Sequence, residues 1–110
     1  MALPKENRIK NKKDIDGIFK KGRTVKSSSL FIRFLDNKKD YSRVALIVPA
    51  KNVYLAVDRN KIKRMLYGEL AKNRSLLKRG LDVIVVVNKK ATRKDFKKLV
   101  GEFKEIMPEI

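Results

Sequence analysis

The 110-residue sequence contains neither cysteine nor histidine. Without thiolate or imidazole groups, the chain lacks the usual zinc ligands, thiol redox chemistry, and general acid or base catalysis by histidine. It also lacks an apolar stretch approaching the roughly 20 residues of a membrane-spanning helix. The N-terminal residues, MALPKENRIKNKK, include no apolar run of signal-peptide length. These absences predict a soluble, cytoplasmic protein, and they predict that any catalysis in which it takes part is carried out by another molecule.

Acidic residues are scarce as well. The chain has 12 Asp and Glu against 29 Lys and Arg, which gives a formal net charge of +17. Such an excess destabilises a compact chain through self-repulsion and favours a polyanionic partner. Nucleic acid is the commonest such partner, and an anionic membrane surface is the next. The hydrophobic fraction of 43% is near the globular average, so the charges surround a core. The length fits a single domain, which we assign to residues 1–110.

Hydrophobic periodicity predicts a mixed protein of helices and strands. Residues 1–10 have little periodicity, and we expect them to form a flexible basic arm. The predicted elements are, in order, a helix in 11–22, a short and a longer strand in 23–36, a strand in 43–49, a helix in about 56–73, a strand in 82–87 and a helix in 92–107. This αβββαβα order indicates the α+β class, as a two-layer α/β sandwich with a four-stranded sheet. The pattern does not specify the order of the strands.

The segment RNKIKRM, residues 59–65, lies in the second long helix and has four cations among its first six residues. At about 100° per residue, the apolar side of this helix contains Ile62, Leu66 and Leu70. The nearly opposite side contains Asn60, Lys63, Arg64 and Tyr67. Cations, amides and aromatic rings hold phosphate oxygens, bond to sugars and bases, and stack on unpaired bases. Charged helix faces are usually only solvated, but the excess of positive charge favours a nucleic-acid surface here.

The wider segment AVDRNKIKRML, residues 56–66, resembles the RNR motif of the bacterial ribonuclease P protein subunit, A-V-x-R-N-x-x-K-R. The flanking segments RIKNKKDIDGIFKKG, RVALIVPAK and GLDVIVVV resemble the family's first helix and the strands around the motif. The resemblance extends in order from about Asn7 to Met107. It implies an α/β sandwich with a left-handed βαβ crossover. It also implies a role in removing the 5′ leader from precursor tRNA, in complex with a large catalytic RNA that carries the active site and binds Mg²⁺.

The resemblance further implies two RNA-binding regions. The RNR motif would face the catalytic RNA through Arg59, Asn60, Lys63 and Arg64. Further candidate contacts to RNA are Lys51, Lys61 and Tyr67. A cleft between the first helix and the sheet would hold the single-stranded leader through Ile15, Phe19 and Arg33.

The sequence departs from the family pattern at several of these positions. Ile15 and Arg33 stand where aromatic residues are common, so Phe19 is the remaining stacking platform. Tyr54 and Leu55 stand where glycine and asparagine are common, and a basic residue is common at position 67. Core packing is an equal alternative for the two residues of the first helix. A solvated sheet edge is the alternative for Arg33.

Other functions fit part of the pattern. A basic RNA-binding or ribosome-associated module without an enzyme partner explains the charge, but not the ordered family resemblance. A self-sufficient nuclease using carboxylates and Mg²⁺ would need an acidic site. The candidate acids, which are more typical of caps and turns, are Asp14, Asp16, Asp36 and Asp40. We therefore assign no metal site to the chain, and we expect neither a membrane nor a small-molecule partner.

Overall fold

The computed structural model describes residues 4–73 and 80–110. The helices are α1 (Lys12–Lys21), α2 (Ala56–Lys72) and α4 (Phe96–Ile106), and the strands are β1 (Arg23–Lys26), β2 (Leu30–Asp36), β3 (Arg43–Ile47) and β4 (Leu81–Val87). Short 3₁₀ turns are η1 (Lys5–Asn7), η2 (Arg93–Asp95) and η3 (Met107–Glu109). The predicted αβββαβα order and the α+β class are confirmed. No helix within the described ranges is long and apolar enough to span a membrane.

The four strands form one mixed sheet in the order β1-β2-β4-β3. β2 is antiparallel to both of its neighbours, whereas β3 and β4 are parallel and are joined through α2, which makes a βαβ unit. β4 is therefore an interior strand, and Val85 pairs with Ile32 on one side and Leu46 on the other. All seven residues of β4 are buried, which explains why its sequence is apolar without alternation except at Asp82.

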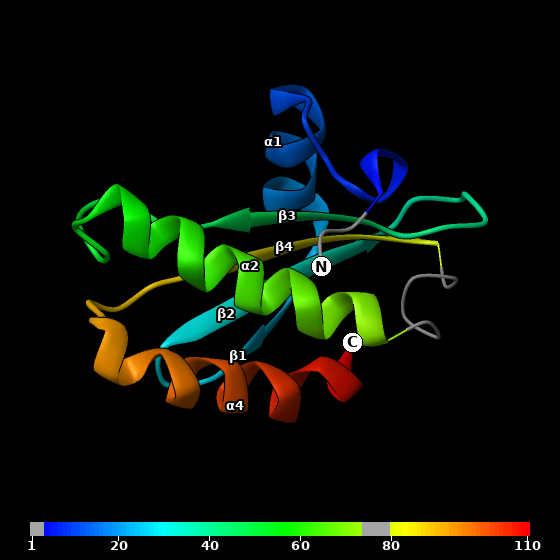
Figure 1. Cartoon of the computed structure of the whole chain (residues 1–110). Coiled ribbons are helices and arrows are strands. Elements are labelled where there is room, and N and C mark those ends of the chain that lie inside the picture. The colour runs from blue at the N-terminus through cyan, green and yellow to red at the C-terminus, as the bar shows by residue number, and fades with distance from the viewer. Residues whose placement is uncertain (1–3, 74–79) are drawn as a thin grey trace.

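Helices cover both faces of the sheet, with α2 and α4 on one face and α1 on the other (Figure 1). β2 follows the alternation expected from its sequence. Leu30, Ile32 and Phe34 contribute to the larger apolar cluster. Phe31 and Leu35 contribute to a smaller cluster on the opposite face, which includes Ile18 of α1. The RNR helix and the first helix therefore lie on opposite sides of the sheet.

Local residues explain why α1 begins and ends where it does. The side chain of Asn11 accepts a hydrogen bond from Lys13 N at 2.8 Å and caps the first turn. At the other end, a Cβ atom on Gly22 would lie 2.6 Å from Ile18 O and 2.9 Å from Phe34 O. Only glycine allows the helix end to approach β2 this closely, so Gly22 places α1 against the sheet.

Of the N-terminal segment 1–10, residues 4–10 dock on the sheet, and residues 1–3 lie outside the described part. Arg8 forms a parallel bridge with Val44 of β3, and Ile9 N donates to Val44 O at 2.9 Å. Asn7 Nδ2 donates to Ser42 O at 2.8 Å. β3 is an edge strand whose outer backbone groups accept a further strand. Burial of Ile9 in the smaller cluster adds to this docking.

Candidate nucleic-acid interface

The outer side of α2 gathers the polar residues of the RNR motif. The buried residues of this helix are Ile62, Leu66 and Leu70. Asn60, Lys61 and Arg64 are exposed, and Lys63 is half-buried. This is the helix orientation expected from the sequence, so three cations and one amide lie together on accessible surface.

Both acidic residues of α2 are paired with cations on its other side. Asp58 Oδ1 accepts a hydrogen bond from Arg93 Nε at 2.6 Å, and the side chain of Asp58 is 14% exposed. Glu69 lies 3.6 Å from Lys72 Nζ and 3.9 Å from Lys104 Nζ. These pairs offset the negative charges of the helix, so its outer side keeps a net positive charge. A surface of this kind attracts phosphate groups.

Arg59 has a different environment from the rest of the motif. Its Nη1 atom donates hydrogen bonds to Val53 O and Tyr54 O, both at 2.8 Å. Arg59 therefore fastens the loop before α2 to the first turn of the helix. At about 100° per residue, Arg59 lies beside the apolar side of the helix, and it is half-buried.

The residues predicted for the leader cleft come together on the opposite face of the sheet. Ile15 is half-buried and packs on the smaller cluster, whereas Phe19 is 36% exposed. Arg33 Nη1 donates to Thr24 Oγ1 at 2.9 Å, and Nη2 donates to Gly22 O at 3.0 Å and to Phe19 O. Its guanidinium carbon lies 5.9 Å from the centroid of the Phe19 ring.

These contacts make Arg33 a cap for the end of α1. The last carbonyl groups of a helix lack partners within the helix, and a cation is favourable there. Arg33 satisfies carbonyls at that end while its guanidinium lies over the Phe19 ring. The structure thus differs from a simple solvated sheet edge, which was the alternative for this residue.

The two remaining candidates for RNA contact, Lys51 and Tyr67, differ in their exposure to solvent. Lys51 is exposed in the loop before α2. Tyr67 is half-buried against the larger cluster, and Arg8 Cζ lies 5.2 Å from its ring centroid. Burial raises the pKa of Tyr67, while the Arg8 cation and a backbone hydrogen bond with Leu46 act in the opposite direction. Tyr67 therefore lies on the flank of α2 beside β3, not on the outermost side expected from helical spacing.

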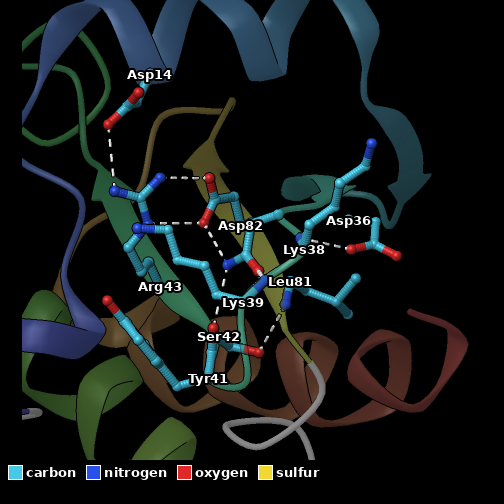
Figure 2. Close-up of polar contacts among 10 residues, drawn as sticks. Asp14, Asp36, Lys38, Lys39, Tyr41, Ser42, Arg43, Leu81 and Asp82 are labelled. Carbon is cyan, nitrogen blue, oxygen red and sulfur yellow. Dashed lines mark hydrogen bonds and ion pairs between the residues drawn. The ribbon is translucent and has the colours of Figure 1, made fainter.

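An ion-pair network joins α1 to the strands beneath it. Arg43 donates from Nε to Asp82 Oδ1 at 2.9 Å, from Nη2 to Asp82 Oδ2 at 2.6 Å and from Nη1 to Asp14 Oδ2 at 3.2 Å (Figure 2). Asn37 Nδ2 donates to Asp82 Oδ1 at 2.9 Å, so the buried carboxylate has several partners. Hydrogen bonding to Asp82 raises the pKa of Arg43 above its already high value, although burial acts against this.

Two of the acidic residues considered for a metal site have described contacts with nitrogen donors. Asp14 pairs with Arg43, and Asp36 Oδ1 accepts from Lys38 N at 2.8 Å within a turn (Figure 2). Among residues 4–73 and 80–110, no group of three or more acidic, histidine or cysteine side chains is placed to hold a metal ion.

The sequence did not reveal the partner of the three serines between β1 and β2, residues 27–29. Glu102 of α4 accepts hydrogen bonds at Oε1 from Ser29 N at 2.8 Å, from Ser28 Oγ at 3.0 Å and from Ser27 Oγ. Burial alone would raise the pKa of Glu102, but the hydrogen bonds from the serines outweigh it and lower the pKa. Three consecutive serines after a strand were the available signal, since such donors need an acceptor when they are partly buried.

Comparison with known proteins connects this fold and this helix to one family. A family model described as Ribonuclease P matches residues 3–110. A ribonuclease P protein component of Pseudanabaena sp. (strain PCC 6903) is 31% identical over 106 residues, which cover 96% of this chain and 91% of that protein. A ribonuclease P protein component of Thermotoga maritima is 30% identical over 89 residues, which cover 81% of this chain and 75% of that protein.

A solved structure of the Staphylococcus aureus RNase P protein has the same fold. It matches with a TM-score of 0.83 and 28% identity, and the match covers 94% of each chain. The fold therefore places the chain in the class of small α+β proteins that are built on this mixed sheet. The chain belongs to the family of bacterial ribonuclease P protein components, as its RNR segment indicated. It is a component of ribonuclease P, a tRNA-processing ribonuclease.

Proposed function

We propose that this chain is an RNA-binding subunit that helps a catalytic RNA remove the 5′ leader from precursor tRNA. It acts as a single domain and binds the catalytic RNA through the outer side of α2. The observation that carries this proposal is the cluster of Asn60, Lys61, Lys63 and Arg64 on accessible surface, with the acids of the helix paired elsewhere. In a chain with a net charge of +17, this surface suits phosphate groups and sugar edges.

The precursor leader binds on the other face of the sheet, at the end of α1. Phe19 offers a partly exposed ring for an unpaired base, and the guanidinium of Arg33 packs over that ring. Because the hydrogen bonds of Arg33 go to the end of α1 and to Thr24, this residue positions Phe19 more than it reaches for phosphate. Ile15 packs beneath the site. With RNA on both faces, the protein bridges the catalytic RNA and its substrate.

The chemistry belongs to the RNA in this proposal. The chain has no histidine or cysteine. As the resemblance to the ribonuclease P family implies, the partner RNA carries the active site and binds Mg²⁺. The contribution of the protein is positive charge and shape, which bring two polyanions together at low metal concentration.

Precursor tRNAs with leaders of increasing length test this function. In the complex with a bacterial ribonuclease P RNA, affinity should rise as the leader lengthens and then level off. If about five leader phosphates are neutralised, the logarithm of the binding constant should fall with a slope near −3.5 against the logarithm of salt concentration. Phe19→Ala and Phe19→Leu should both reduce the increase in affinity that the leader provides, by about 5- to 150-fold, because neither side chain can stack on a base.

The leucine variant distinguishes stacking from packing. Leucine keeps an apolar side chain at the end of α1 but removes the ring. Full leader recognition in Phe19→Leu would mean that Phe19 only packs. Affinity that does not depend on leader length would favour the second candidate, a basic RNA-binding module without a role in leader removal, which the same net charge supports.

A further inference from the structure

An exposed apolar patch lies where α2 begins. Tyr54 is 86% exposed, Leu55 is 52% exposed and Val57 is 55% exposed. In the described part of the chain, the other exposed large hydrophobic side chain is Phe19, at 36%. Three such residues within four positions are unusual on a soluble domain, and contiguous apolar surface marks an interaction site. We call these three residues the Tyr54 patch.

The backbone that carries Tyr54 is held firmly. Arg59 donates to the carbonyl of Tyr54 at 2.8 Å from the first turn of α2. On the same loop, Asn52 Nδ2 donates to Val87 O at 2.8 Å, and Asn52 O accepts from Ala91 N at 2.9 Å. The loop is thus fastened both to α2 and to the end of β4. An aromatic ring on such a loop is presented at little cost in conformational entropy, which favours binding.

A hollow lies beside Tyr54, between this loop and the segment before α4. Its volume is about 400 Å³, within the range of about 300–1,000 Å³ typical of small-ligand sites. Two exposed lysines line it, Lys51 and Lys90. Asp95 also lines it, but its carboxylate accepts hydrogen bonds from Thr92 N at 2.8 Å and Thr92 Oγ1 at 3.3 Å. The hollow therefore combines an aromatic wall with two cations and polar groups.

The geometry points to a second base-stacking site, in which an unpaired nucleobase of the partner RNA stacks on Tyr54 and its phosphates lie near Lys51 and Lys90. This inference rests on the proposed function, because the ligand is the same RNA that binds α2. An aromatic face with flanking cations is the arrangement that holds single-stranded nucleic acid. The patch directly precedes the outer side of α2, so one RNA can contact both.

The charge around the patch decides between RNA and a second copy of this chain. Two copies, each with a net charge of +17, repel each other, and the lysines beside Tyr54 would face like charge across a symmetric contact. An RNA strand instead gains from the same lysines.

Substitutions of Tyr54 test the site in the full chain, with a bacterial ribonuclease P RNA transcript as the probe. Tyr54→Ala should weaken binding by about 5- to 150-fold, the range for loss of one stacked base. Tyr54→Phe keeps the ring and should bind like the original chain. Tyr41→Ala is the control at a second, half-buried tyrosine, because Tyr41 precedes β3 whereas Tyr54 follows it, so the two residues flank opposite ends of that strand.

Fluorescence provides a second readout that does not depend on affinity. The chain has no tryptophan, so Tyr54→Trp introduces a single indole whose emission should be quenched when a base stacks on it. Tyr41→Trp should show no quenching on addition of the same RNA.

Two outcomes would overturn the site while leaving the proposed function in place. In the first, Tyr54→Ala binds like the original chain although Arg64→Ala binds more weakly. In the second, Tyr54→Ala converts a dimer of the free protein into a monomer without changing RNA affinity, which would assign the patch to a second copy. If the original chain does not bind the RNA at all, the site and the proposed function both fail.

Discussion

Replacing Arg64 with alanine tests whether the RNR helix makes specific contacts with RNA. Arg64 is exposed on α2, and alanine is the best helix former, so the free energy of unfolding should change by less than about 0.5 kcal/mol. A hydrogen bond to a charged group contributes about 1.5–3 kcal/mol. This corresponds to a dissociation constant about 10- to 150-fold higher. We expect Arg64→Ala to weaken binding to a bacterial ribonuclease P RNA by a factor in that range.

Lys72→Ala is the matched control for this experiment. Lys72 lies in the last turn of α2, its side chain is 77% exposed, and it pairs with Glu69 at 3.6 Å. Each variant lowers the net charge of +17 by one, so a diffuse electrostatic field weakens equally in both. Filter binding at several salt concentrations should give a slope shallower by about 0.7–0.9 for Arg64→Ala only. Equal losses of affinity in the two variants would refute a specific contact at Arg64.

Three further predictions concern the framework that carries these surfaces. Asp82→Ala leaves Arg43 without its main partner and should lower the free energy of unfolding by about 3 kcal/mol in urea titrations; a loss below about 1 kcal/mol would contradict a structural role for the pair. Gly80 has φ +73°, and a Cβ there would lie 2.2 Å from Lys39 O. Gly80→Ala should therefore cost on the order of 1–3 kcal/mol, and an unchanged melting temperature would argue against this turn. Because the pKa of Glu102 is lowered in the folded state, its stabilising contribution is complete above the ordinary pKa of a glutamate and is lost as pH falls through the lower folded value. In urea titrations at acidic pH, Glu102→Gln should lose less stability than the original chain as pH falls. Identical pH profiles for the variant and the original chain would exclude a contribution from Glu102.

Local patterns in the sequence were sufficient for most elements of the fold. The run of β-branched residues in β4, without alternation, predicted an interior strand because both of its faces are covered. Asn11 and Gly22 marked the limits of α1, since a side-chain cap and a close backbone approach depend on neighbouring residues. The buried side of α2 followed from helical spacing alone. In each case the physical cause lies within a few positions along the chain.

Features that depend on distant segments could not be predicted in the same way. The docking of Ile9 depends on the free edge of β3, and the strand order that creates this edge is not encoded in any single segment. The contacts of Arg33 depend on how α1 crosses β2, so spacing suggested only an edge residue. The partial burial of Tyr67 likewise depends on Arg8, far away in the sequence, which lies over its ring.

Cleavage of a precursor tRNA at low Mg²⁺ concentration tests the central claim most directly. A bacterial ribonuclease P RNA would be assayed with and without this protein, alongside a control that contains the protein alone. The account predicts that the protein restores cleavage when the RNA is present and that the protein alone cleaves nothing. Cleavage by the protein alone would contradict the assignment of catalysis to RNA, and tight binding to a cognate RNA without restored cleavage would contradict the role in leader removal.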